Sequence, residues 1–179
     1  MRENIFEESN GNSLFKNEDA LSPDYFPDQV IGRDAQINEL AACLKPIEEG
    51  RKCSHAFVYG SPGTGKTTCC NKVIAQLNEY TTKAACIYAN CWQHSSRQAL
   101  LSLIAGKIEP TLPRRGIAGD EILQRVTEQL KRANKTLVIV LDEADKLFFN
   151  NEQNVLYDLG RLKEVWGANS CVILVSNSQ

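Results

Sequence analysis

One octapeptide in the sequence has the residue types and spacing of a phosphate-binding loop. It reads Gly60-Ser61-Pro62-Gly63-Thr64-Gly65-Lys66-Thr67 and matches the pattern G-x-x-x-x-G-K-[ST] in full. Glycines let the backbone curl so that its N–H groups point at phosphate oxygens, and a helix that starts there adds partial positive charge. Lys66 can reach the β- and γ-phosphates, and the Thr67 hydroxyl can bind Mg²⁺. The alternative is a glycine-rich turn with a chance lysine. The glycine spacing differs from the dinucleotide pattern G-x-G-x-x-G.

Two carboxylates form the second candidate group. Asp142 and Glu143 directly follow the apolar run Leu137–Leu141, which predicts a strand that ends at the carboxyl edge of a sheet. We expect Asp142 to hold the water shell of Mg²⁺ and Glu143 to act as general base on the attacking water. The alternative is an acidic cap on the next segment, since acidic residues also favour a helix start.

A third, weaker signal is Asn177, which follows the apolar run Cys171–Val175. A polar side chain just past a buried strand could touch the γ-phosphate or orient the attacking water. A plain turn that contains Asn explains the same residue equally well.

Alternating strands and helices must position these groups. Four short apolar runs, rich in Val, Ile and Leu, predict buried strands at 55–59, 85–89, 137–141 and 171–175. Apolar residues at helical spacing predict helices between them, which favours a parallel sheet covered on both faces. The helical stripes are Ile37–Leu44, which Pro46 ends or kinks, Cys70–Leu77, Leu101–Ile108 with a cap near Ser95 and Ser96, Leu123–Leu130, and Val155–Trp166.

Composition limits the remaining possibilities. A chain of 179 residues with 42% apolar residues suits one core of domain size, and residues 1 to 20 resemble a polar tail. The formal charge of −2 excludes a protein surface that is basic overall and binds nucleic acid through that charge. It does not exclude a local basic patch. Without a membrane-length apolar run or a signal peptide, we expect a soluble, cytoplasmic protein. An odd count of seven cysteines, with no C-x-x-C pair, favours buried thiols over disulfides or a metal cluster.

Together these motifs resemble an AAA+ ATPase, a P-loop NTPase of the α/β class. Gly60–Thr67 is similar to the Walker A motif of that family, Asp142-Glu143 to Walker B, and Asn177 falls where sensor 1 falls. More narrowly, the segments at 21–27, 32–34, 90–91 and 141–147 resemble the archaeal Orc1/Cdc6 replication initiators. The resemblance covers roughly residues 14 to 179, and we expect residues 21–179 to form a partial AAA+ domain.

The resemblance implies a set of functional residues and partners. It implies ATP or ADP and Mg²⁺ as cofactors, double-stranded origin DNA and the replicative helicase as partners, and further initiator subunits as possible ones. Glu143 and Asn177 would be catalytic, and Thr67 and Asp142 would hold the metal. The nucleotide would be bound by Val30, Ile31, Arg33, Gly60, Ser61, Pro62, Gly63, Thr64, Gly65, Lys66, Thr67 and Thr68, and DNA by Arg114, Arg115 and Gly116.

The sequence also departs from that family. Members continue through a fifth strand, an arginine finger, a helical lid and a winged helix, whereas this sequence ends two residues after Asn177. We therefore expect an incomplete core, in a fragment, a truncated product or a chain that a partner completes. The absent fifth strand would leave His55–Tyr59 as an exposed sheet edge, and the absent arginine finger would make ATP hydrolysis weak.

Three other functions stay open at this stage. Asp142-Glu143-Ala144-Asp145 spells the DEAD box of helicases, but such a helicase needs a second domain that this length cannot hold. A clamp loader or helicase loader of the AAA+ type would carry the same loop and carboxylates. An ATP-binding remnant without turnover would bind nucleotide tightly and release no phosphate.

Overall fold

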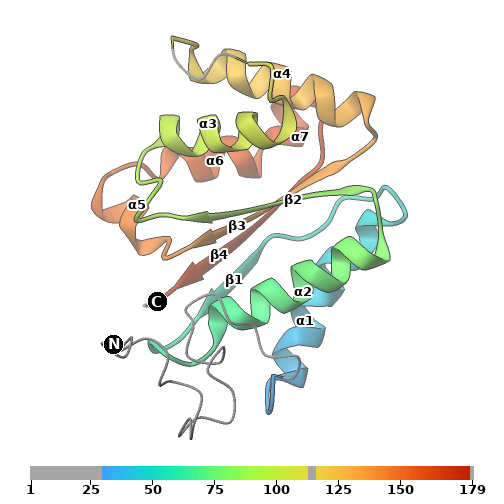
Figure 1. The fold of residues 1–179 in the computed structure, drawn as a ribbon, viewed down its shortest axis with the longest axis vertical. Coiled ribbons are helices and arrows are strands. Elements are labelled where there is room, and N and C mark those ends of the chain that lie inside the picture. Colours follow the sequence, from blue (N-terminus) through green and yellow to red (C-terminus); the bar gives the residue numbers. More distant parts are fainter. Residues whose placement is uncertain (1–29, 113–115, 178–179) are drawn as a thin grey trace, which may run out of the picture. The chain divides into compact units, whose positions relative to one another are not determined.

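The computed structural model describes residues 30–112 and 116–177, and the chain divides into two units, Met1–Ile31 and Gly32–Gln179. All described helices and strands belong to the second unit (Figure 1). In chain order they are α1 (Asp34–Leu44), the 3-10 helix η2 (Lys45–Ile47), β1 (Ala56–Tyr59), α2 (Lys66–Tyr80), β2 (Ala84–Asn90), α3 (Arg97–Ile108), α4 (Gly119–Arg132), β3 (Thr136–Asp142), α5 (Asp145–Phe149), α6 (Asn154–Gly160), α7 (Leu162–Trp166) and β4 (Ser170–Ser176).

The four described strands form one parallel sheet in the order β1-β4-β3-β2. The last strand in the chain, β4, therefore lies between β1 and β3. Tyr59 at the end of β1 pairs with Ser176 of β4, and Asn90 of β2 pairs with Asp142 of β3. Because all strands run the same way, the loop after β1 and the residues after β3 and β4 meet at one edge of the sheet. The predicted parallel α/β sheet is confirmed.

Helices cover both faces of the sheet, as the continuous apolar strands predict. In Figure 1, α1 and α2 lie on one side of the strands, and α3, α4, α6 and α7 lie on the other. Successive residues of β3 point to opposite faces, so Ile139 packs in the core under α3 and α4 while Val138 and Val140 pack in the core under α1 and α2. β3 is one of the two inner strands of the described sheet, and every one of its residues is buried.

The predicted helices occur, with one correction. Ser96 caps α3 as expected, because its Oγ accepts a hydrogen bond from the backbone N–H of Ala99 at 3.2 Å. The single helix predicted over Val155–Trp166 is wrong, since the structure has two short helices, α6 and α7, in its place. Gly160 is a poor helix former, and Arg161 after it leaves the helical region at φ −101° and ψ 14°. Helix α5 was not predicted at all.

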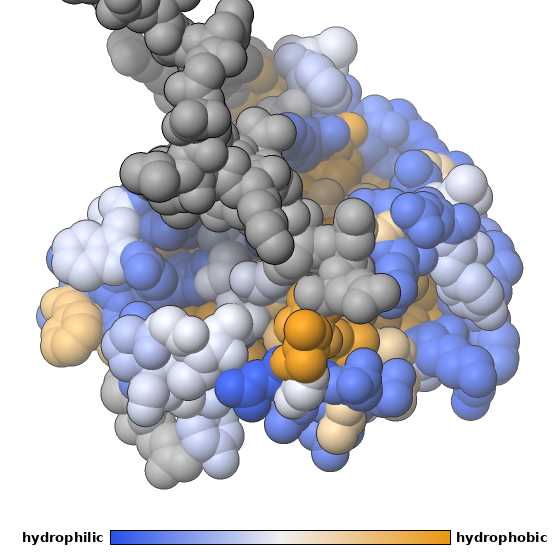
Figure 2. Space-filling view, turned by 60° about the horizontal axis from the view of Figure 1, so that its bottom comes forward, coloured by the Kyte–Doolittle hydropathy of each residue, from blue (hydrophilic) through white to orange (hydrophobic). Residues whose placement is uncertain are grey.

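Strand β1 lies at an edge of the described sheet, as predicted for His55–Tyr59. Its Phe57 and Tyr59 side chains stack on each other with ring centroids 5.4 Å apart, and each is about half exposed. A hollow of about 400 Å³ beside them is lined by Phe57, Phe148, Phe149 and Leu174 among others. Figure 2, which brings the lower side of Figure 1 forward, shows small hydrophobic groups between larger hydrophilic areas. Within the described residues, no helix combines the length and apolar character needed to cross a membrane.

The burial of β3 inside the sheet predicts a large effect of truncating its core side chains. Ile139→Ala removes a fully buried side chain and should lower the free energy of unfolding by about 2–5 kcal/mol, measured by urea denaturation. Val165→Ala, at a residue of α7 that is 59% exposed, is the control and should change it by less than about 0.5 kcal/mol. Equal losses in the two variants would contradict the assigned core.

Candidate functional site

The predicted phosphate-binding loop connects the edge strand β1 to the start of α2. Gly60, Gly63 and Gly65 have φ angles of 154°, 75° and 83°, in the region where side chains other than glycine are strained. Gly65 takes the N-cap position of α2, so the helix begins at Lys66 and its free N–H groups face the loop. The octapeptide therefore adopts the strand, loop and helix arrangement that a phosphate cradle requires.

The ammonium group of Lys66 lies across the mouth of this loop. Its Nζ donates to the carbonyl oxygens of Gly60 at 2.8 Å and Ser61 at 3.0 Å. It also donates to the side-chain Oδ1 of Asn177, at 2.9 Å, just past the end of β4. Lys66 thus joins the loop after β1 to the residue that the sequence marked as the third signal, 111 positions away.

The carboxylate of Asp142 connects the loop to the neighbouring strands. Its Oδ2 accepts a hydrogen bond from the Thr67 hydroxyl at 2.7 Å, and its Oδ1 accepts one from the backbone N–H of Glu143 at 2.9 Å. Asp142 is only 5% exposed, which fits a carboxylate whose oxygens are occupied by donors. The structure thus brings together two residues, Thr67 and Asp142, that were predicted to share a metal.

Tyr88 is a member of this group that the sequence did not identify. Its hydroxyl, on β2, donates to the same Oδ2 of Asp142 at 2.6 Å. Burial, followed by the hydrogen bond to Asp142, raises the pKa of Tyr88 above its ordinary value, so the hydroxyl keeps the proton that it donates. The only signal in the sequence was the position of Tyr88, one residue before the end of the strand predicted at 85–89.

Asp145 is a second residue that sequence reasoning left without a role. It is the first residue of α5, and its carboxylate accepts hydrogen bonds from Ser176 Oγ at 2.6 Å and from the backbone N–H of Asn177 at 3.0 Å. The backbone N–H of Ala144 donates to the carbonyl of Val175 at 2.9 Å. These contacts fix the end of β4, and with it Asn177, against the segment that follows β3.

Glu143, the predicted general base, stands in an unusual backbone conformation. Its φ of 53° is in the left-handed region, which non-glycine residues rarely adopt. Residues held in such conformations cluster at functional sites, where surrounding contacts enforce them. Here the carbonyl of Glu143 accepts a hydrogen bond from Lys146 and its N–H donates to Asp142, so both backbone groups are fixed.

The carboxylates make this edge of the sheet electronegative. Burial, and then the negative charges of Asp142, Glu143 and Asp145, raise the pKa of the Cys91 thiol to about 12. Burial and the charge of Asp142 likewise raise the pKa of Cys70 to about 12.

The donor set fits magnesium better than a softer metal. Mg²⁺ prefers oxygen ligands and is bound in nucleotide sites through one or two protein oxygens together with phosphates and waters. The Thr67 hydroxyl uses its single hydrogen on Asp142, which leaves the lone pairs of Oγ1 for a metal ion. Two hard oxygen groups beside a phosphate cradle match that pattern.

Further residues predicted to bind the nucleotide lie in or near the same loop and helix. The Thr64 hydroxyl donates to the carbonyl of Ser61 at 2.8 Å within the loop, Pro62 lies in the same loop, and Thr68 is in the first turn of α2. Arg33 precedes α1. Burial raises the pKa of the Cys69 thiol on α2, and the positive charge of Arg33 opposes that rise.

The predicted DNA and adenine residues lie mainly elsewhere in the chain. Arg114 and Arg115 lie outside the described residues, and Gly116 follows them with a φ of 81°. Val30 and Ile31 belong to the first unit. Their suggested contacts with DNA or adenine stay predictions.

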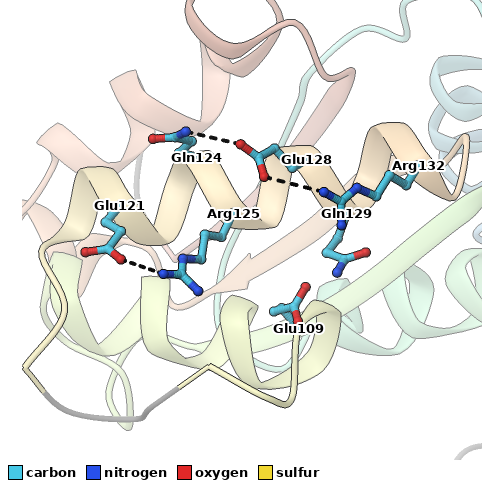
Figure 3. Close-up of a pocket in the computed structure, with 7 residues that line it drawn as sticks. All are labelled: Glu109, Glu121, Gln124, Arg125, Glu128, Gln129 and Arg132. Carbon is cyan, nitrogen blue, oxygen red and sulfur yellow. Dashed lines mark hydrogen bonds and ion pairs between the residues drawn. The ribbon is translucent and has the colours of Figure 1, made fainter.

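A separate hollow of about 550 Å³ lies along α4 and the end of α3 (Figure 3). Its two arginines are each paired with a carboxylate, because Arg125 contacts Glu121 at 3.0 Å and Arg132 contacts Glu128 at 4.0 Å. The arginines of this hollow are therefore neutralised by neighbouring carboxylates on the same helix, unlike Lys66, whose partners in the loop are neutral oxygens.

One protein family and several related proteins match most of this chain in sequence. Residues 29–173 match the AAA ATPase domain family. The chain is 35% identical over 171 residues to ORC1-type DNA replication protein 1 of Archaeoglobus fulgidus, which covers 93% of this chain and 42% of that protein. It is 34% identical over 158 residues to ORC1-type DNA replication protein 2 of Methanothermobacter thermautotrophicus, covering 86% of this chain and 41% of the relative.

Solved structures agree with these relatives. The Aeropyrum pernix ORC1 protein, solved in complex with DNA, is 29% identical with a TM-score of 0.75, over 91% of this chain and 43% of that one. The Cdc6p protein of Pyrobaculum aerophilum is 27% identical with a TM-score of 0.76, over 90% and 43% of the two chains. This chain thus spans less than half the length of the proteins it matches.

The conformation of the loop makes a prediction about its glycines. A Cβ at Gly65 would meet no atom within 4 Å, so Gly65→Ala should act through the positive φ alone and lower the free energy of unfolding by about 1–2 kcal/mol. Gly106→Ala is the matched control, since Gly106 lies within α3 with equally open space and alanine there should raise it by about 0.5–1 kcal/mol. Urea denaturation measures both, and opposite signs are expected. If Gly65→Ala left the free energy of unfolding unchanged, this result would contradict the assigned loop conformation.

Proposed function

Because the chain belongs to the AAA ATPase family and matches the N-terminal part of archaeal ORC1-type DNA replication proteins, we propose that it is the ATP-binding core of a replication initiator. In this proposal it binds ATP with Mg²⁺, contacts double-stranded origin DNA and helps to load the replicative helicase in the cytoplasm. The relatives support an initiator role, and the geometry of the loop supports the nucleotide.

One observation carries the nucleotide part of the proposal. Lys66 and Thr67, Asp142, and Asn177 come from three separate places in the sequence. Hydrogen bonds join Lys66 to Asn177 at 2.9 Å and Thr67 to Asp142 at 2.7 Å. They meet beside a glycine loop that opens a helix, at the carboxyl edge of a parallel sheet. Cation, hydroxyl, carboxylate and amide are the four groups that a magnesium-bound triphosphate requires around it.

Each residue then has a distinct task. The N–H groups of the loop and of the first turn of α2 would bind phosphate oxygens, and Lys66 would exchange its carbonyl partners for phosphate. Thr67 and Asp142 would hold Mg²⁺, which supplies neutralising charge to the phosphates when bound. Asn177, already within reach of Lys66, would contact the terminal phosphate or orient a water molecule beside it.

Hydrolysis is a separate claim from binding. Glu143 would accept a proton from the attacking water, and such a general base contributes about 10²–10⁴-fold. An arginine finger contributes about 10³–10⁵-fold in related enzymes, so the rate of hydrolysis depends on groups beyond those that bind the nucleotide. Tight binding without phosphate release would favour the nucleotide-binding remnant over the ATPase.

The DNA part of the proposal rests on the relatives and on two arginines. The Aeropyrum pernix relative was solved in complex with DNA. Arg114, Arg115 and Gly116 fall in the segment between α3 and α4, where adjacent guanidinium groups could bind phosphates and a glycine would allow close backbone approach. A clamp loader or helicase loader would not require this basic segment.

The loop makes a direct prediction for nucleotide binding. Lys66→Ala removes charge-assisted hydrogen bonds worth about 1.5–3 kcal/mol each, so ATP affinity measured by calorimetry with Mg²⁺ should fall by about 10–100-fold or more. Stabilisation by ATP in thermal unfolding, about 2.7 kcal/mol at 100 times the dissociation constant, should fall with it. Lys135→Ala, at an exposed lysine before β3, is the control and should bind normally. Normal ATP binding by Lys66→Ala would refute the proposed site.

The segment that contains Arg114 and Arg115 makes a prediction about DNA binding. The double change Arg114→Glu and Arg115→Glu should weaken binding to duplex DNA and reduce the slope of log affinity against log salt by about 1.8, because each lost phosphate contact contributes about 0.9. Arg51→Glu with Lys52→Glu is the matched control, since it changes the charge equally at another adjacent basic pair. If both double variants lower affinity alike, the effect is one of net charge and the assigned DNA contact is wrong.

A further inference from the structure

Three donors hold the carboxylate of Asp142, and one of them has no task in the proposed function. Thr67 and Tyr88 both donate to Oδ2, at 2.7 and 2.6 Å, while the N–H of Glu143 donates to Oδ1 at 2.9 Å. A carboxylate has about four acceptor positions, so the two hydroxyl groups occupy those of Oδ2. Asp142 is thus fixed from α2, from β2 and from its own backbone.

Tyr88 is itself held in place. Tyr88 pairs with Val140 on the neighbouring strand β3, two residues before Asp142, so its side chain reaches along the sheet toward the carboxylate. Asn90, two residues further along β2, pairs with Asp142 itself, and its Oδ1 accepts a hydrogen bond from the backbone N–H of Trp92 at 2.8 Å. The register of β2 on β3, together with the fixed end of β2, therefore holds Tyr88 beside Asp142.

We infer that Tyr88 is a positioning residue for the magnesium site: its hydroxyl orients Asp142 so that Thr67 presents its free lone pairs to the metal ion. This inference rests on the proposed binding of ATP and Mg²⁺ at the loop. If Asp142 turned away, Thr67 would lose its acceptor and its hydroxyl hydrogen could point into the metal position. Partners that orient metal ligands in this way typically contribute about 10–100-fold to metal affinity.

A purely structural role for Tyr88 leads to a different result. In that case the hydroxyl only satisfies a buried carboxylate, and its loss would lower stability without changing how ATP affinity depends on Mg²⁺. The relevant quantity is therefore the ratio of ATP affinities with Mg²⁺ and with a chelator, measured by calorimetry on folded protein.

Tyr88→Phe removes only the hydroxyl group. We expect this variant to keep the wild-type ATP affinity in EDTA. The ratio of its ATP affinities with Mg²⁺ and with EDTA should be lower than that of the wild type by about tenfold or more. Tyr80→Phe, at an exposed tyrosine that ends α2, is the matched control and should keep the full increase. A full increase in Tyr88→Phe would overturn the inference while leaving the proposed function intact. Absence of ATP binding by the wild-type chain would overturn the proposed function itself, and the inference with it.

A double-mutant cycle with Asp142→Asn tests whether Tyr88 influences magnesium binding through Asp142. If Tyr88 acts through Asp142, Tyr88→Phe should produce little further change in the magnesium ratio once Asp142 is replaced, because the two residues share one interaction. Independent, additive effects would overturn the inference. Since the cycle compares ratios within each variant, a general loss of stability does not imitate the expected result.

Discussion

The site depends on the parallel pairing of β4 between β1 and β3. This order places the phosphate loop, Asn177 and Asp142 at the same edge, although they are separated by up to 117 positions in the sequence. If β4 instead lay outside β3, Asn177 could not reach Lys66. The pairing is specified by strands that are apolar on both sides and can only be buried between two layers of helices. The hydrophobic core thus determines which polar groups meet.

Charge balance at that edge explains why its residues have so many partners. The carboxylates of Asp142 and Asp145 are satisfied by hydroxyl and backbone donors, and Lys66 by carbonyl and amide oxygens. The contacts of the described residues include no direct ion pair between Lys66 and Asp142, so these two charged groups do not neutralise each other. Both remain able to interact with groups of opposite charge, which is the arrangement that a negatively charged ligand with a divalent cation needs.

The sequence allowed the strands, the loop and the carboxylate pair to be predicted, because each has a local pattern. The 3.6-residue spacing of Val155, Leu159 and Leu162 also indicated a helix, but periodicity is insensitive to a single residue that leaves the helical region, as Arg161 does. Tyr88 could not be found in this way. Its contact with Asp142 spans 54 positions and depends on strand register, which leaves no local trace in the sequence.

The position of Lys66 has a consequence for the edge strand that carries the loop. β1 has four residues, pairs only with β4 among the described strands, and leaves Phe57 and Tyr59 half exposed. Lys66 adds a connection to the backbone hydrogen bonds between β1 and β4, because its ammonium group links the carbonyl oxygens after β1 to the side chain of Asn177 after β4. In the proposed function, phosphate would replace the carbonyl partners of Lys66, and both Asn177 and the loop would contact the ligand. Binding at the loop would then be coupled to the stability of the β1–β4 edge, and the ligand would stabilise an edge strand that pairs on one side only.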